Sequence, residues 1–126
     1  AEDNDRIMPG TCLVAPGSVA HMEVVRAGGQ YRVRLRSGDK VTGHRPSVDV
    51  LFHSVARYVG KNAVAALLTG MGRDGAEGLM AIKKAGGRTI AQSPETCVVY
   101  GMPKMAWEMG AEQEQLPLEK IPERLL

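Results

Sequence analysis

The sequence is poor in aromatic residues, with one Trp, three Tyr and one Phe among 126 residues. So few rings among its arginines leave no stacking platform for single-stranded nucleic acid. No apolar run approaches the roughly 20 residues that span a bilayer, so we expect no membrane insertion. The opening residues, AEDNDR, are too acidic and polar for a secretory signal, and we predict a cytoplasmic protein.

Cysteine is also scarce. Cys12 and Cys97 lie far apart in the chain and match neither a CxxC metal pair nor a dense disulfide framework. We therefore predict two reduced thiols, of which at least one lies in the core, and no metal site.

The net charge is only +2, but the basic residues are unevenly distributed. Six of them fall within twenty positions: Arg26, Arg32, Arg34, Arg36, Lys40 and Arg45. Arginine that alternates with apolar residues on a strand is most often a solvated face, although such a stretch also suits an acidic protein surface. Nucleic acid is not an expected partner.

With 44% hydrophobic and 24% charged residues, residues 1–126 fit one globular domain. Residues 10–17 have the pattern of a short buried strand closed by a Pro-Gly turn. Residues 21–36 predict a β-hairpin that turns at Gly28-Gly29 and packs one face. Ser47 is the expected N-cap of a helix that ends at Gly60.

Residues 62–69 form an almost wholly apolar run, which is typical of a strand in the middle of a parallel sheet covered by helices. A helix from Ala76, a strand over 88–91 and helices over 103–109 and 118–126 follow. The strand-helix-strand order is that of a right-handed crossover unit. We therefore predict an α/β fold: a doubly wound, mainly parallel sheet with flanking helices and a β-hairpin.

The segment 70–75, GMGRDG, is the first place to look for chemistry, because ligands of open parallel sheets bind outside the carboxyl ends of the strands. Gly70, Gly72 and Gly75 also satisfy G-x-G-x-x-G, and Glu95 lies where a ribose-binding acid would stand. However, Asp74 would bring a negative charge close to a pyrophosphate. Nucleotide binding is therefore the weaker interpretation.

Asp74 has two possible roles. It can cap the helix that follows it, which is the simpler role on local sequence, or it can orient a histidine toward a nucleophile. His21, His44 and His53 are each expected to be structural or exposed, because no serine or cysteine stands beside them in a recognisable catalytic pattern. No serine has the G-x-S-x-G setting of a nucleophile elbow.

Three strings together resemble one family: HRPSVDVLF at 44–52, LTGMGRDG at 68–75 and CVVYGMP at 97–103. In this order and spacing they are similar to the catalytic domain of chemotaxis protein-glutamate methylesterases, over essentially the whole chain. The resemblance implies a serine hydrolase with a Ser-His-Asp triad and no cofactor. Its substrates would be glutamyl methyl esters, and in many members also glutamines, on the cytoplasmic signalling helices of chemoreceptors.

The resemblance assigns the triad aspartate to Asp74. Gly70, Met71, Gly72 and Gly75 become the active-site loop, and the Met71 amide becomes an oxyanion donor. The family's serine and histidine segments, and its receiver domain, precede all the residues present here. We therefore expect residues 1–126 to be the C-terminal portion of the catalytic domain, with the apolar strand over 62–69 lacking neighbours.

Losing the serine or histidine of another triad hydrolase costs about 10⁶ in turnover, so this chain alone is expected to be close to inert. Two alternatives remain. The chain could be a non-catalytic module that docks on receptors through its arginine-rich stretch, or a nucleotide-binding α/β module. Receptor binding without hydrolysis would favour the first, and nucleotide binding the second.

Overall fold

The computed structural model describes residues 1–126, and its first regular element is the expected hairpin. Strands β1 (His21–Ala27) and β2 (Gln30–Arg36) pair antiparallel, with Val24 opposite Val33. Gly28 and Gly29 form the two-residue turn, both at positive φ, where glycine carries no steric penalty. Val33 is buried while Arg34 is exposed, so the predicted packed and solvated faces are confirmed.

Three parallel strands form a separate sheet in the order β3-β4-β5, made of β3 (Val64–Leu67), β4 (Arg88–Gln92) and β5 (Glu114–Leu116). The prediction that β3 lies in mid-sheet is wrong for this chain, because β3 is an edge strand. It does have one neighbour, β4, and Val64 at its start is 38% exposed. An apolar run indicates a strand suited to burial, but it carries no information about which partners flank it.

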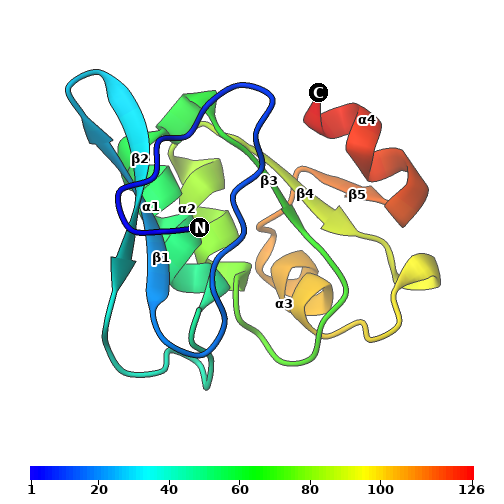
Figure 1. Ribbon diagram of the computed structural model, residues 1–126. Helices are drawn as coiled ribbons and strands as arrows, with labels where there is room; N and C mark the ends of the chain where they lie inside the picture. Colours follow the sequence, from blue (N-terminus) through cyan, green and yellow to red (C-terminus); the bar gives the residue numbers. More distant parts are fainter.

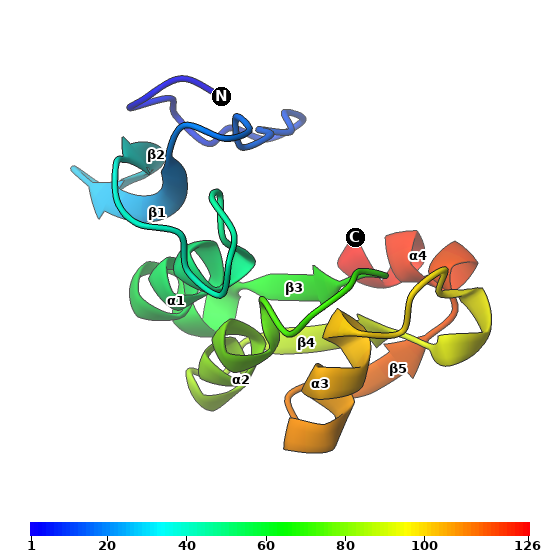
Figure 2. The same ribbon diagram turned by 90° about the horizontal axis from the view of Figure 1, so that it is seen from below.

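Four α-helices join and cover these sheets: α1 (Val48–Tyr58), α2 (Ala76–Lys84), α3 (Met102–Met109) and α4 (Ile121–Leu125). Figures 1 and 2 show α1 between the hairpin and α2, and α2 between α1 and the parallel sheet. In both views α4 lies on the opposite face of that sheet from α2 and α3. Helices on both faces of a parallel sheet confirm the predicted doubly wound α/β fold.

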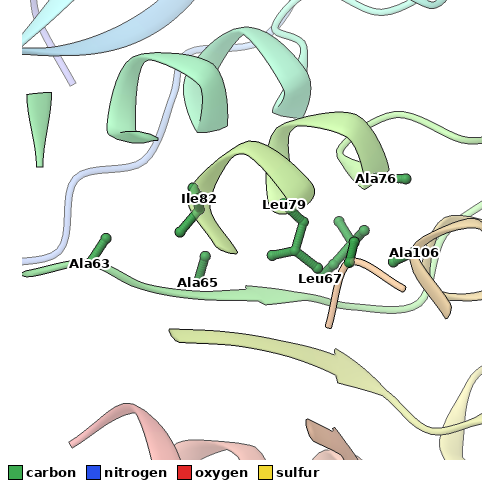
Figure 3. Close-up of a cluster of buried hydrophobic side chains, with 8 residues drawn as sticks. Ala63, Ala65, Leu67, Ala76, Leu79, Ile82 and Ala106 are labelled. Atoms are coloured by element: carbon green, nitrogen blue, oxygen red, sulfur yellow. The ribbon is translucent and has the colours of Figure 1, made fainter. Parts of the chain in front are cut away.

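The main core lies where α2 meets the sheet. Leu79 and Ile82 of α2 are fully buried against Ala63, Ala65 and Leu67 (Figure 3). Small alanines on the strand let the helix approach closely, and the leucine and isoleucine side chains fill the space between them. The second contact of α1 is with the hairpin, where the Val24 amide donates to the Ser54 hydroxyl at 2.8 Å.

Four local predictions differ from the structure. Neither cysteine lies in the core, because Cys12 is exposed and Cys97 is only half-buried. Residues 10–17 are irregular rather than a buried strand, and Val14 is exposed. Strand β5 was not expected, because its Glu-Gln-Leu sequence has no strand pattern. The final helix is divided into a 3₁₀ turn (Leu118–Lys120) and α4, because Pro122 begins a new first turn.

Candidate active site

Asp74 lies in the segment that follows β3, at the carboxyl end of the parallel sheet, and only 2% of it is exposed. Its Oδ1 accepts hydrogen bonds from the Ser47 hydroxyl at 2.7 Å and the Asp49 amide at 3.0 Å. Its Oδ2 accepts from the Val48 amide at 2.7 Å. All three donors stand at the start of α1. Asp74 therefore caps a helix, as predicted. The capped helix is α1, whereas the local sequence indicates the following helix, α2.

These donors decide the ionisation of Asp74. Burial by itself favours the neutral acid, but the hydrogen bonds from the Asp49 amide, the Ser47 hydroxyl and the Val48 amide outweigh it. The pKa of Asp74 is consequently lower than that of an ordinary aspartate. The positive end of the α1 dipole acts in the same direction. Asp74 is a buried carboxylate that stays charged.

The N-terminus of α2 is bound by a carboxylate side chain of α1. Asp49, which is 4% exposed, accepts the Gly78 amide on Oδ1 at 2.8 Å. Burial raises the pKa of Asp49, the Gly78 bond offsets part of that rise, and the neighbouring charge of Asp74 adds to it. The N-terminus of α1 is therefore bound by a carboxylate from the loop that precedes α2, and the N-terminus of α2 by a carboxylate from α1.

The segment 70–75, here called the glycine loop, is tied to residues 99–102. The Gly70 carbonyl accepts the amides of Gly101 and Met102, at 3.1 and 2.8 Å. A Cβ at Gly101 would stand 2.6 Å from the Gly70 carbonyl oxygen and 3.2 Å from the Met71 Cα. Only glycine fits there. The glycine loop is thus held in place by a second, distant segment.

Met71 of the glycine loop is 76% exposed. Neither its amide nor that of Gly72 donates a hydrogen bond within the chain. Gly75, by contrast, is buried, and a Cβ there would lie 2.7 Å from Leu67 and 2.8 Å from Val48. The loop accordingly presents free amides at its tip and packs tightly at its end.

None of the three histidines hydrogen-bonds to Asp74. His44 and His53 are exposed. His21 is buried, and its ring lies 2.7 Å from the Asp39 carbonyl oxygen through Nε2 and 3.1 Å from the Ser47 amide through Nδ1. Because an amide can only donate and a carbonyl can only accept, His21 carries its proton on Nε2. Both ring nitrogens are engaged, so His21 has no free nitrogen for a nucleophile.

A dinucleotide does not fit the glycine loop. The Gly78 amide at the start of α2, where a pyrophosphate would bind, is already occupied by the Asp49 carboxylate. The side chains of Leu67 and Val48 pack against Gly75, so a ligand has no approach there. The largest hollow of the molecule, about 400 Å³, lies between the hairpin and α1 and is lined by none of the loop residues.

The chain is thus a doubly wound α/β domain whose charged, buried Asp74 and glycine loop lie at the carboxyl end of the strands, where such domains bind ligands. Comparison with known proteins identifies the family of this domain. The family model for CheB methylesterase matches residues 1–125.

Two curated relatives match the whole chain. A protein-glutamate methylesterase/protein-glutamine glutaminase 2 of Pseudomonas aeruginosa is 60% identical over 126 residues, which cover 36% of that relative. The protein of the same name in Shewanella oneidensis is 52% identical over the same length, again 36% of the relative. The chain thus spans a little over a third of the length of these relatives.

A solved structure, the catalytic domain of the CheB methylesterase of Thermotoga maritima, superposes with a TM-score of 0.95 at 40% identity. The match covers 99% of this chain and 66% of that domain. The chain belongs to the CheB methylesterase family, a family of carboxylic ester hydrolases, and matches a C-terminal portion of its catalytic domain. No helix is both long and apolar enough to cross a membrane.

Sequence reasoning singled out Asp74 and the glycine loop but missed three residues that hold them. The sequence predicts Ser47 only as a helix cap, and Asp49 and Gly101 appear only as members of the family strings. The only sequence signal for these three residues is that they belong to the family strings that also contain or accompany the Asp74 loop. Ser47 and Asp49 bond to Asp74 across 27 and 25 positions, which no local pattern predicts.

Proposed function

We propose that this chain supplies the aspartate, Asp74, of a Ser-His-Asp triad. The triad hydrolyses glutamyl methyl esters, and deamidates glutamines, on the cytoplasmic signalling helices of chemoreceptors. The observation that carries the proposal is a buried, charged carboxylate at the carboxyl end of β3, in a chain whose relatives are named for these two reactions. Both reactions pass through acyl transfer from a glutamyl carbonyl.

Asp74 has one acceptor position left for an imidazole. A carboxylate offers about four lone-pair positions, and three of them are used by Ser47, Val48 and Asp49. The unused position is on Oδ2. The Thr42 hydroxyl makes a small contribution to the lowered pKa of Asp74, but the hydrogen bond that it donates goes to the Val41 carbonyl at 2.7 Å. An imidazole Nδ1–H that donates to Oδ2 would fill the fourth acceptor position of the carboxylate.

The chemistry of a triad then assigns the other roles. The serine attacks the glutamyl carbonyl, and the histidine takes the serine proton and gives it to the departing oxygen or nitrogen, which leaves as methanol or ammonia. Water, deprotonated by the same histidine, then hydrolyses the glutamyl-serine ester and frees the serine. Asp74 fixes the tautomer of the histidine and stabilises the imidazolium. The free amides of Met71 and Gly72 suit the oxyanion of the tetrahedral intermediate. Gly70 and Gly75 hold the loop at its two ends.

The serine and the histidine of this proposal lie outside residues 1–126. Ser47 touches Asp74 but is 2% exposed, and its hydroxyl proton is directed at the carboxylate, so it is not an accessible nucleophile. None of the histidines inside the chain hydrogen-bonds to Asp74, and both ring nitrogens of His21 are engaged. The greater length of the relatives, of which this chain covers 36%, is consistent with this.

The experiment measures methanol release from methylated receptor and ammonia release from receptor glutamines. Three samples are compared: residues 1–126 alone, the polypeptide encoded by the complete reading frame, and that polypeptide with Asp74→Asn. We expect no activity from the first, full activity from the second, and a loss of about 10⁴ in kcat from the third, as when another triad hydrolase receives asparagine at this position.

Two results would contradict the proposal. Hydrolysis by residues 1–126 alone would mean that another serine and histidine are responsible. Activity of the Asp74→Asn polypeptide within tenfold of the parent would remove Asp74 from the triad. Receptor binding with no hydrolysis in any sample would instead favour the alternative of a non-catalytic receptor-interaction module.

A further inference from the structure

Ser47, the N-cap of α1, donates its hydroxyl proton to Asp74 and its backbone amide proton to His21. We propose that Ser47 is a positioning residue that fixes the orientation of the Asp74 carboxylate, and that His21 holds Ser47 in place. This inference rests on the proposed triad role of Asp74. Neither residue touches the reacting atoms.

The first argument is a comparison of the two bonds that the Ser47 hydroxyl makes. It donates to Oδ1 of Asp74 at 2.7 Å, and it accepts the Val50 amide at 3.4 Å. Amide bonds to oxygen are normally 2.7–3.2 Å long, so the capping bond to Val50 is weak, whereas the bond to the carboxylate is short and charge-assisted. The principal partner of the hydroxyl is therefore Asp74.

The second argument comes from His21, the first residue of β1. Its Nδ1 accepts the Ser47 amide at 3.1 Å, while Nε2 donates to the Asp39 carbonyl at 2.7 Å. A buried histidine whose two ring nitrogens are both hydrogen-bonded has a structural role. It keeps the backbone of Ser47 at one distance from β1, so the hydroxyl meets Asp74 in one geometry.

The consequence for Asp74 is a carboxylate that cannot turn. Ser47 and the Asp49 amide both hold Oδ1, so Oδ2 is the oxygen left for an imidazole. Without the hydroxyl, the Asp49 amide at 3.0 Å would be the only donor left to Oδ1, so the plane of the carboxylate would be less firmly fixed. A triad histidine would then meet a less well-aligned acceptor.

The test uses the polypeptide encoded by the complete reading frame and compares Ser47→Ala with a matched control, Ser54→Ala. Ser54 is also buried in α1 and also bonds through its hydroxyl, to the Val24 amide and the Leu51 carbonyl, but it does not contact Asp74. Two quantities are read: kcat and KM for methanol release, and the titration of the Asp74 carboxyl carbon by NMR.

We expect Ser47→Ala to lower kcat about tenfold with KM unchanged, the loss appropriate to one hydrogen bond to a charged group. The pKa of Asp74 should rise, because a donor to the charged form is gone. Ser47→Thr, which keeps the hydroxyl, should restore most of the parent kcat and most of the lowering of the Asp74 pKa. Ser54→Ala should leave kcat per folded molecule and the Asp74 titration unchanged. If Ser47→Ala does not fold, Ser47→Gly provides the same test, because glycine is tolerated at an N-cap.

The positioning role is overturned if Ser47→Ala changes neither the Asp74 titration nor kcat by more than twofold. It is equally overturned if Ser54→Ala lowers kcat as much as Ser47→Ala does, since the effect would then be general loosening of α1. An Asp74→Asn polypeptide that retains activity would instead overturn the triad proposal. In that case the titration of Asp74 in Ser47→Ala still reports whether Ser47 controls the carboxylate.

Discussion

The starts of α1 and α2 are built alike, yet the two carboxylates that bind them behave in opposite ways. Asp74 and Asp49 are almost equally buried, at 2% and 4% exposure. Burial favours the neutral form of both, but the pKa of Asp74 is lowered and that of Asp49 is raised. The difference lies in the donors. Asp74 accepts a hydroxyl and two amides, whereas Asp49 has the Gly78 amide and faces the charge of Asp74.

The comparison teaches that the number of donors, and not depth, decides which carboxylate remains charged. A triad aspartate must carry a negative charge to stabilise an imidazolium. Of the two, only Asp74 is equipped for that role. Asp49 serves to join the two helices, and three changes would break or sharpen this contrast.

The largest effect on stability is expected from Asp74→Ala. The Ser47 hydroxyl and the amides of Val48 and Asp49 would lose their acceptor while buried, and unsatisfied buried groups cost roughly 1–3 kcal/mol each. Allowing for partial access of water, we expect a loss of about 3 kcal/mol at pH 7 in urea denaturation. Glu77→Ala, an exposed acid two residues into α2, is the control and should change stability by less than about 0.5 kcal/mol. A loss below about 1 kcal/mol for Asp74→Ala would contradict the account.

A smaller effect is expected from Gly78→Ala, which disturbs the contact between the helices without removing a charge. The new Cβ would stand 2.5 Å from the Phe52 Cβ and 3.2 Å from Oδ1 of Asp49, so α1 and α2 must separate. Overpacking of this kind costs about 2 kcal/mol. Lys84→Ala at the exposed end of the same helix should have little effect. If Gly78→Ala were neutral in thermal unfolding, the close approach of the helices would be wrong.

The smallest effect is expected from Asp49→Asn, and it is the one that depends most clearly on pH. The amide oxygen keeps the Gly78 bond while the charge is removed. Because the pKa of Asp49 is raised on folding, the charged form costs stability, and that cost appears as the pH rises through the folded pKa. We expect a gain of about 0.5–1 kcal/mol at pH 7 that vanishes below about pH 4.

Asp74 gives the opposite sign in the same titration. Its pKa is lowered on folding, so it contributes stability above its unfolded pKa of about 4 and loses it as the pH falls through the folded value. Urea midpoints from pH 3 to 8 separate the two carboxylates. Parallel pH profiles for Asp49→Asn and the parent protein would show that Asp49 is not perturbed by folding.

The sequence predicts what local patterns encode. The alternation over 30–36, the Gly28-Gly29 turn and the Ser47 cap each depend on neighbours within a few positions, and all three appear in the structure. Other features depend on partners more than twenty positions away. They are the edge position of β3, the existence of β5, and the hydrogen bonds that Asp74 and Asp49 accept at the starts of α1 and α2. Periodicity reports which side chains prefer burial, but it does not identify the group they meet.

The contact between Gly101 and the glycine loop has a bearing on protein engineering. Because Gly70 bonds to Gly101 and Met102, and no side chain fits at Gly101, the six-residue loop is half of a two-part unit. Transplanting GMGRDG alone into another α/β scaffold would deliver the right residues in an unsupported shape. A graft that is to reproduce this loop has to carry residues 99–102 with it, held at the same spacing.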